Sequence, residues 1–312
     1  MNTTWLLTAG VGLVAVIAVS TTEMDAVQTA DLVAFDNARG EVRMDKPCAV
    51  PARDESAFRL QTEESALPPT VADGTSAAAQ FATLVAAMQR GDTDMHVVVE
   101  LRDLLHSHPE LASTFAEVAR HPQTGDRVGV RLAQALERCG DAHCQVALTS
   151  IADDSNAAES IRTQAVRSLG SVPQPTEATV ASLWAMAHAP HQRTDEAMLA
   201  FGRATASAKA DDQSLHHHCC DSIRMELRRS TDPSTSRVLL KALAAAGYTA
   251  IADEAVTLLG AADADLRATA AYVLLSCNGP QVEAIARDLL AVEHDQEVRR
   301  IVVRGLQHRG KT

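Results

Sequence analysis

A short phrase recurs along this chain at nearly constant spacing. It consists of an apolar residue followed by Arg, then an apolar stripe of helical period, then a Gly or polar break. Successive copies are separated by about 30–32 residues, apart from one double-length gap, and this is the length of one helix–turn–helix unit. A fixed period of this size is typical of a stacked array of repeats. The clear copies start at Ile161-Arg162, Leu266-Arg267 and Val298-Arg299, and the looser ones at Val130-Arg131 and Ser236-Arg237.

Helical periodicity continues almost without interruption from about residue 76 to the end of the chain. Glycines such as Gly140 and Gly170 follow apolar runs, as C-terminal helix caps do, and Pro233 and Pro280 stand where a first helical turn is expected. The pattern predicts helices over residues 77–90, 93–106, 109–120, 126–139, 142–152, 158–169, 175–188, 194–207, 213–229, 233–246, 249–259, 264–277, 280–292 and 295–308.

The short loops between these helices make successive helices antiparallel neighbours. The chain is 46% hydrophobic but only 3% aromatic, so small and straight-chain apolar side chains must fill its core. Such residues suit closely packed helices. We therefore expect an all-α fold, a right-handed α-solenoid of antiparallel helix pairs over residues 76–310. Helices 264–277 and 280–292 illustrate one expected pair.

The recurring Arg is expected to have a structural role. Asp263 and Asp295 precede Arg267 and Arg299 at the same offset. Each Asp can cap its helix and pair with an Arg of the adjoining repeat, and a ladder of such pairs would fix the register between repeats. The expected register residues are Arg162, Arg237, Asp263, Arg267, Asp295 and Arg299.

The phrase Asp-x-x-apolar-Arg-x-x-Ala, set in paired helices, resembles the HEAT-repeat family. The resemblance covers roughly residues 76–312 and is clearest over 155–309. It implies a curved solenoid that binds another protein along one face. The sequence departs from the pattern between Gly170 and Arg237, where Glu196 and Ala197 replace the apolar–Arg pair.

A narrower resemblance concerns lipid carriage. The run from Leu239 to Tyr248, followed by Leu266 to Ala271, is similar to the helical domain of vitellogenin-type lipid-transfer proteins. In that family the helices wrap a lipid cavity built mostly by large β-sheets, for which this chain has no room. The likeness implies a helical layer alone, which would need a partner chain to carry lipid.

The N-terminal region differs from the rest. Trp5–Ser20 has no charged residue and is shorter than the roughly 20 apolar residues of a membrane span, so it fits the core of a signal peptide. Ala18-Val19-Ser20 is an acceptable cleavage site. The alternatives are an uncleaved anchor and a buried helix of a cytosolic protein. Residues 1–20 thus predict export, to the periplasm, the medium or a tethered position, and residues 21–75 predict a partly disordered linker.

Six cysteines would be compatible with disulfides in an exported protein. Cys139 and Cys144 bracket the tight segment Gly140 to His143, where two helices could place the thiols within bonding distance. We expect either a disulfide between them or two half-buried thiols at a helix–helix turn.

A second cluster suggests metal binding. In the run His216 to Cys220, followed by Asp221, His216 and Cys220 would share one helical face, and these are zinc or copper ligands. The alternative is structural, because Leu215, Cys219, Ile223 and Leu227 form an ordinary apolar stripe that would leave the histidines exposed.

The formal net charge of −12 disfavours nucleic acid and anionic membrane surfaces as partners. The sequence has no phosphate-binding Gly-rich loop, zinc-protease helix or nucleophile elbow. We expect a non-enzymatic protein–protein interaction scaffold without a cofactor, acting in the cell envelope or secreted. The alternatives are a lipid-binding helical shell and a metal-binding accessory protein; an enzyme-subunit role rests on fold analogy alone.

Overall fold

The structure is a computed structural model that describes residues 76–91, 95–189, 194–209 and 212–309. Within these ranges the chain is all-α, with α-helices, one short 3₁₀ helix and no strand, so the predicted fold class is confirmed. The helices belong to one compact unit, Glu64–Thr312. The predicted signal peptide (1–20) and linker (21–75) lie outside the described residues.

The helices begin and end within about two residues of the predicted bounds, which is the ordinary uncertainty of helix ends. The predicted helix 109–120 opens with the 3₁₀ turn. In chain order the elements are α2 (Ala77–Gln89), α3 (Met95–Ser107), η1 (Pro109–Leu111), α4 (Ala112–Arg120), α5 (Asp126–Cys139), α6 (Ala142–Asp153), α7 (Glu159–Ser171), α8 (Glu177–Ala187), α9 (Thr194–Ala208), α10 (Gln213–Arg229), α11 (Pro233–Ala245), α12 (Ile251–Leu258), α13 (Ala264–Ser276), α14 (Pro280–Val292) and α15 (Gln296–Arg309).

Side-chain caps explain where several helices begin. Asp141, Thr176, Asp232 and Asp263 each accept a hydrogen bond from the backbone N–H three residues later. Such a cap satisfies one of the N–H groups that a helix start leaves without an intrahelical partner. The helix boundaries are therefore specified locally, which is why sequence periodicity and cap residues located them.

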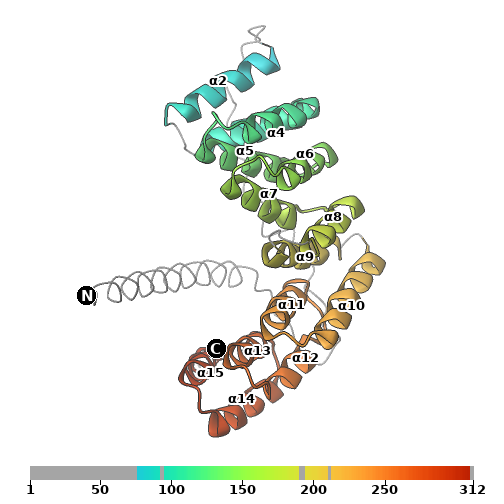
Figure 1. Cartoon of the computed structure of the whole chain (residues 1–312), viewed down its shortest axis with the longest axis vertical. Helices are drawn as coiled ribbons and strands as arrows, with labels where there is room; N and C mark the ends of the chain where they lie inside the picture. Colours follow the sequence, from blue (N-terminus) through green and yellow to red (C-terminus); the bar gives the residue numbers. More distant parts are fainter. Residues whose placement is uncertain (1–75, 92–94, 190–193, 210–211, 310–312) are drawn as a thin grey trace, which may run out of the picture. The chain divides into compact units, whose positions relative to one another are not determined.

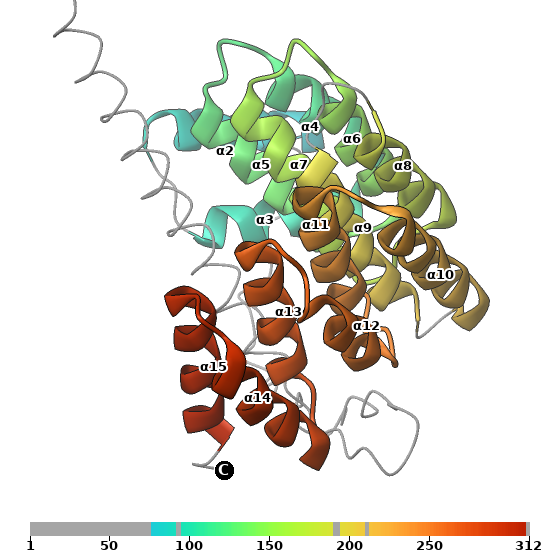
Figure 2. The same cartoon turned by 60° about the horizontal axis from the view of Figure 1, so that its bottom comes forward.

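The odd-numbered helices α3, α5, α7, α9, α11, α13 and α15 form what we call the odd row, in which each helix packs against the next odd one. Each even-numbered helix packs against the odd helix that follows it (Figure 1). Figure 2 shows the same alternation for the C-terminal helices α12 to α15. This packing of neighbours fits the expected stack of helix pairs. The predicted pairing of helix 264–277 with helix 280–292 was wrong, because α13 packs more extensively against α12 than against α14.

Glycine allows the helices of the odd row to approach closely. Gly170 was predicted to cap a helix, but it lies inside α7, and a Cβ there would come within 2.6 Å of the backbone of Ala200 in α9. Gly202 of α9 faces the backbone carbonyl of Ala242 in α11 in the same way. The prediction for Gly170 was wrong because a tertiary contact, rather than a helix end, requires the small residue.

One apolar cluster runs through all the helices from α2 to α15. Alanine, leucine and valine make up most of it, as the low aromatic content predicted. Near its N-terminal end the rings of Phe81 and Phe115 stack with centroids 4.2 Å apart, which anchors α2 to α4. Since the core is shared by successive helices, each helix pair depends on its neighbours for burial.

Candidate functional site

Three of the recurring arginines lie where an odd helix starts and bond backbone carbonyls at or just after the end of the preceding even helix. Carbonyl oxygens there have no intrahelical partner and carry partial negative charge, so a guanidinium satisfies them. The bonds run from Arg162 to Ala152 O (3.5 Å), from Arg267 to Ala261 O and Ala262 O (2.9 Å each), and from Arg299 to Leu290 O (2.7 Å) and Glu293 O (2.9 Å). In these three helix pairs, the repeated phrase therefore fixes the turn between the two helices.

Register between pairs depends on a different acid from the one predicted. The Arg267 guanidinium donates to both carboxylate oxygens of Glu293, at 2.7 and 2.9 Å. Asp263 and Asp295 do cap α13 and α15, accepting from Leu266 N and Val298 N at 2.7 and 3.1 Å. The carboxylates of Asp263 and Asp295 thus each bond the start of their own helix, and the Arg267 guanidinium pairs with Glu293 instead.

Glu293 is almost fully buried, with 4% of its side chain exposed. The hydrogen bonds from Arg267 lower the pKa of Glu293 to about 2, and the N–H groups of His294 and Asp295 add to this. Arg237 bridges a second pair of repeats by donating to Asp265 at 3.0 Å, where the acid is mostly exposed. All of these contacts hold neighbouring helices of the fold together.

The structure brings His216 and Cys220 together, as the helical spacing predicted, and gives Nε2 of His216 a backbone partner. Nε2 of His216 donates to the carbonyl oxygen of Ala246 at 2.9 Å and lies 3.6 Å from the Cys220 Sγ. Nε2, the His216 nitrogen that lies near the thiol, thus carries a proton and donates it to the carbonyl oxygen. The buried Lys209 ammonium helps to lower the pKa of His216, after burial itself, and would repel a cation. Within the described ranges, no third His, Cys or acidic ligand joins the two.

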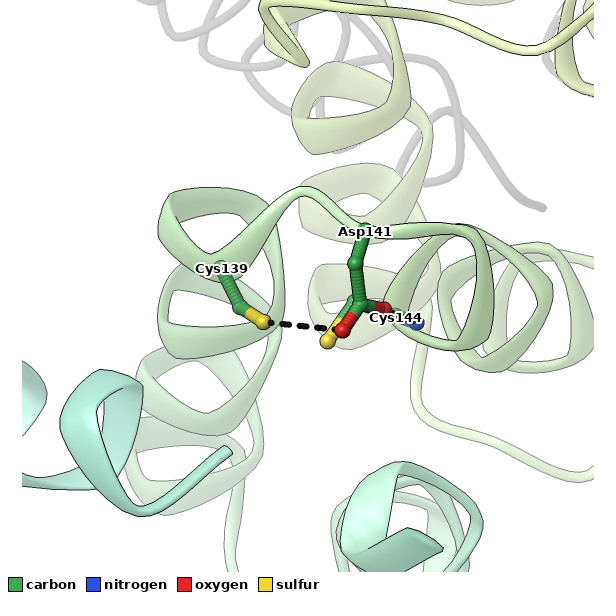
Figure 3. A group of neighbouring side chains, drawn as sticks. All are labelled: Cys139, Asp141 and Cys144. Carbon is green, nitrogen blue, oxygen red and sulfur yellow. Dashed lines mark hydrogen bonds between the residues drawn. The ribbon is translucent and has the colours of Figure 1, made fainter. Parts of the chain in front are cut away.

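Cys139 and Cys144 are two separate thiols at the turn between helices, Cys139 half-buried and Cys144 buried, as in the alternative to a disulfide. Their sulfur atoms nevertheless lie within 4.8 Å of each other and of a carboxylate oxygen of Asp141. Figure 3 shows the three side chains converging where α5 ends and α6 begins. The sequence pointed to the two cysteines, but the inward-facing Asp141 was missed, because only its capping geometry turns it between the thiols.

A polar pocket of about 300 Å³ lies on the odd row between α5 and α7. Three arginines and one acid, Glu137, line it. Burial raises the pKa of Glu137, although the Ser168 hydroxyl donates to its carboxylate at 2.6 Å. Sequence reasoning missed this site, although its residues recur at helical spacing. They are Arg131, Gln134, Glu137 and Arg138 of α5 and Gln164, Arg167 and Ser171 of α7.

The large exposed apolar side chains of the described residues are few. They occur singly on five helices, as Val146, Met225, Val256, Val292 and Val303. No helix in the described ranges is long and apolar enough to cross a membrane.

No family model matches the chain, and no curated protein matches it. Among solved structures, that of an engineered protein aligns with 73% of this chain and 96% of its own, at 17% identity and a TM-score of 0.33. A likeness this low carries no argument about fold or function.

Proposed function

We propose that this chain is a non-enzymatic scaffold, a HEAT-like α-solenoid that binds a protein partner along the odd row. The observation that carries the proposal is the pocket between α5 and α7. It combines three arginines with amide and hydroxyl groups on a surface made by two repeats at once. The pocket therefore exists only in the stacked array, as expected for a binding surface in a repeat protein.

The chemistry of the pocket favours an acidic segment of the partner. Guanidinium groups bind carboxylates through paired, charge-assisted hydrogen bonds, and arginines are frequent anchors of protein interfaces. Arg138 and Arg167 are exposed at the pocket, although Arg167 also lies 3.9 Å from a carboxylate oxygen of Glu196 in α9. Arg131 is half-buried and held at 2.8 Å by Gln134. A cluster of three arginines is a distinct local feature in a chain whose net charge is −12.

The apolar segment Trp5–Ser20 supports placing this scaffold in the cell envelope or outside the cell. An exported scaffold would meet its partner there.

The test is a pull-down with the C-terminally tagged chain from native cell-envelope extract, with mass spectrometry of proteins, lipids and metals. The variant Arg131→Gln/Arg167→Gln removes two pocket charges, and Arg229→Gln at the end of α10 is the matched control outside the pocket. We expect a protein partner that is retained by Arg229→Gln and reduced at least about tenfold by the double variant, since an anchor residue contributes more than about 1 kcal/mol.

If the wild type, the double variant and Arg229→Gln captured the partner equally, the assignment of the pocket as the binding surface would be overturned. Abundant lipid in place of any protein partner would overturn the scaffold proposal and favour the helical-shell alternative. Equal melting temperatures of the three proteins would show that the substitutions leave the fold intact.

A further inference from the structure

The turn between α5 and α6 holds three ligand atoms in a fixed arrangement. Cys139 is the last residue of α5, and Gly140 reverses the chain with φ of 68°, a conformation that suits glycine. Asp141 caps α6, and its Oδ1 accepts from the Cys144 N–H at 2.7 Å. Two rigid helix ends thus position the side chains of Cys139, Asp141 and Cys144.

We propose that Cys139, Asp141 and Cys144 bind a zinc ion. Their sulfur and oxygen ligand atoms lie within 4.8 Å of one another, and the Cys139 Sγ lies 3.5 Å from the Asp141 Oδ2. Zinc–sulfur bonds of about 2.3 Å and zinc–oxygen bonds of about 2.1 Å in a tetrahedron separate the ligand atoms by roughly 3.5–3.8 Å. Small side-chain rotations therefore suffice to surround a zinc ion.

The donor set selects the metal. Thiolates favour zinc over magnesium and calcium, which prefer oxygen ligands. The two oxygens of Asp141 have different partners, because Oδ1 accepts from the backbone at the helix cap while Oδ2 accepts from the Cys139 thiol. A capped carboxylate is an oriented ligand, and orientation by a second hydrogen bond is usual for metal ligands.

Burial raises the pKa of both thiols, so they are neutral until a cation displaces their protons. Cys144 stands in the first turn of α6, where the helix N-terminus stabilises a thiolate. The binding step is then an exchange in which two thiol protons leave to solvent and two thiolate–zinc bonds form.

His106 of α3 can supply the fourth ligand. Its Nδ1 lies 3.9 Å from the Cys139 Sγ, and its exposed ring can turn toward the cluster. Zinc held by all four residues would tie α3 to the turn between α5 and α6, and so would join three successive helix pairs.

A disulfide between the same cysteines explains less of this geometry. A disulfide needs no carboxylate, yet Asp141 lies at the two sulfur atoms (Figure 3). In the described part of the chain, no other group of three His, Cys or acidic side chains meets the same distance criterion. The presence of a third, oxygen ligand favours metal binding.

The test uses the full chain, reduced with a phosphine and freed of metal with a chelator. Titration with Co²⁺ reports thiolate ligation through its charge-transfer and visible absorption bands, and Zn²⁺ should displace it at one ion per chain. We expect Cys139→Ser to weaken Zn²⁺ binding more than about 100-fold, since even second-layer partners of a metal site contribute 10–100-fold. Cys277→Ser, at another half-buried cysteine, is the matched control and should bind as the wild type does.

Two further variants identify the ligands. Asp141→Asn keeps the helix cap, because Asn is as good a cap as Asp, but removes the anionic ligand and should weaken binding at least about tenfold. Cys144→Ala should abolish the thiolate bands attributable to two sulfur ligands. If Cys144→Ala fails to fold, alkylation of the wild type replaces it: Zn²⁺ should slow modification of Cys139 and leave Cys277 unchanged.

Absence of thiolate-to-cobalt absorption in the wild-type chain would overturn the proposal. Undiminished Zn²⁺ binding by Cys139→Ser, with loss in Cys220→Ala, would place the metal at His216 and Cys220 and would overturn it equally. Neither outcome depends on whether the pocket between α5 and α7 binds a protein.

Discussion

The middle of the odd row and its C-terminal end are held in register by different forces. Between α7 and α11, glycines let the helix backbones touch, with Gly170 against Ala200 and Gly202 against Ala242. At the C-terminal end, the buried pair of Arg267 in α13 and Glu293 in the turn between α14 and α15 joins successive helix pairs. Steric contact therefore fixes the middle of the array, and a titratable ion pair contributes at its C-terminal end.

This difference predicts different sensitivities. Backbone contact responds to side-chain volume and does not depend on protonation, whereas an ion pair responds to pH and to loss of either partner. Substitutions at the two places should therefore separate the two mechanisms.

The largest expected effect is at the C-terminal end. Glu293→Ala leaves the Arg267 guanidinium without its acid in a site where Glu293 is only 4% exposed. Removing one partner of a buried ion pair costs about 3–5 kcal/mol of unfolding free energy. Urea unfolding measures this change, and Glu283→Ala, at a more exposed pair on α14, is the control with an expected cost below about 1 kcal/mol. Equal costs for the two variants would contradict the contrast between the two regions.

The same pair predicts an acid-sensitive component of stability. The folded-state pKa of Glu293 is about 2, against 4.5 for the unconstrained group. The stabilisation is complete above pH 4.5 and is lost as the pH falls toward 2, because the unfolded chain then binds the proton more readily. It amounts to roughly 3 kcal/mol by linkage. Unfolding free energies between pH 6 and pH 3 should fall more steeply in the wild type than in Glu293→Gln, and parallel curves would contradict this.

Most of the fold could be predicted from the sequence. Apolar periodicity, together with caps such as Asp141 and Asp263, specifies helix bounds through contacts within a few residues. The failures concern tertiary contacts. Gly170 resembled a helix end because its role depends on Ala200, which is 30 positions away and has no local signature.

The candidate sites were less predictable for the same reason. Cys139 and Cys144 are close in sequence, so their proximity was foreseeable, but the inward Oδ2 of Asp141 follows from cap geometry. The basic pocket needs α5 and α7 side by side, and residues such as Arg131 and Arg167 belong to different repeats. For His216 and Cys220 the helical spacing correctly brought the two side chains together, but spacing alone does not show that Nε2 donates to the carbonyl oxygen of Ala246.

A smaller effect is expected in the middle of the odd row. Gly202→Ala places a Cβ against the backbone carbonyl of Ala242, which cannot move without shifting α11. Overpacking of this kind costs about 1–3 kcal/mol, against a gain of about 1 kcal/mol from helix propensity, so we expect a net loss of about 2 kcal/mol at most. Gly305→Ala meets only the side chain of Leu275, which can rotate, and should be close to neutral. Urea unfolding at pH 7 distinguishes them, and greater damage from Gly305→Ala would refute the steric account.

The smallest expected effect concerns the helix cap at Asp263, which the recurring phrase encodes through a contact within one helical turn. Asp263→Ala removes the cap that accepts from Leu266 N, while Arg267 keeps its bonds to Glu293 and to Ala261 O. Loss of such a cap costs about 1 kcal/mol, and Asp263→Asn should restore most of it because Asn also caps well. If Asp263 instead fixed the register between repeats by pairing with an arginine, the neutral Asn would not rescue stability. Recovery in Asp263→Asn would therefore assign register at the C-terminal end to Glu293 and capping to the aspartate of the repeat.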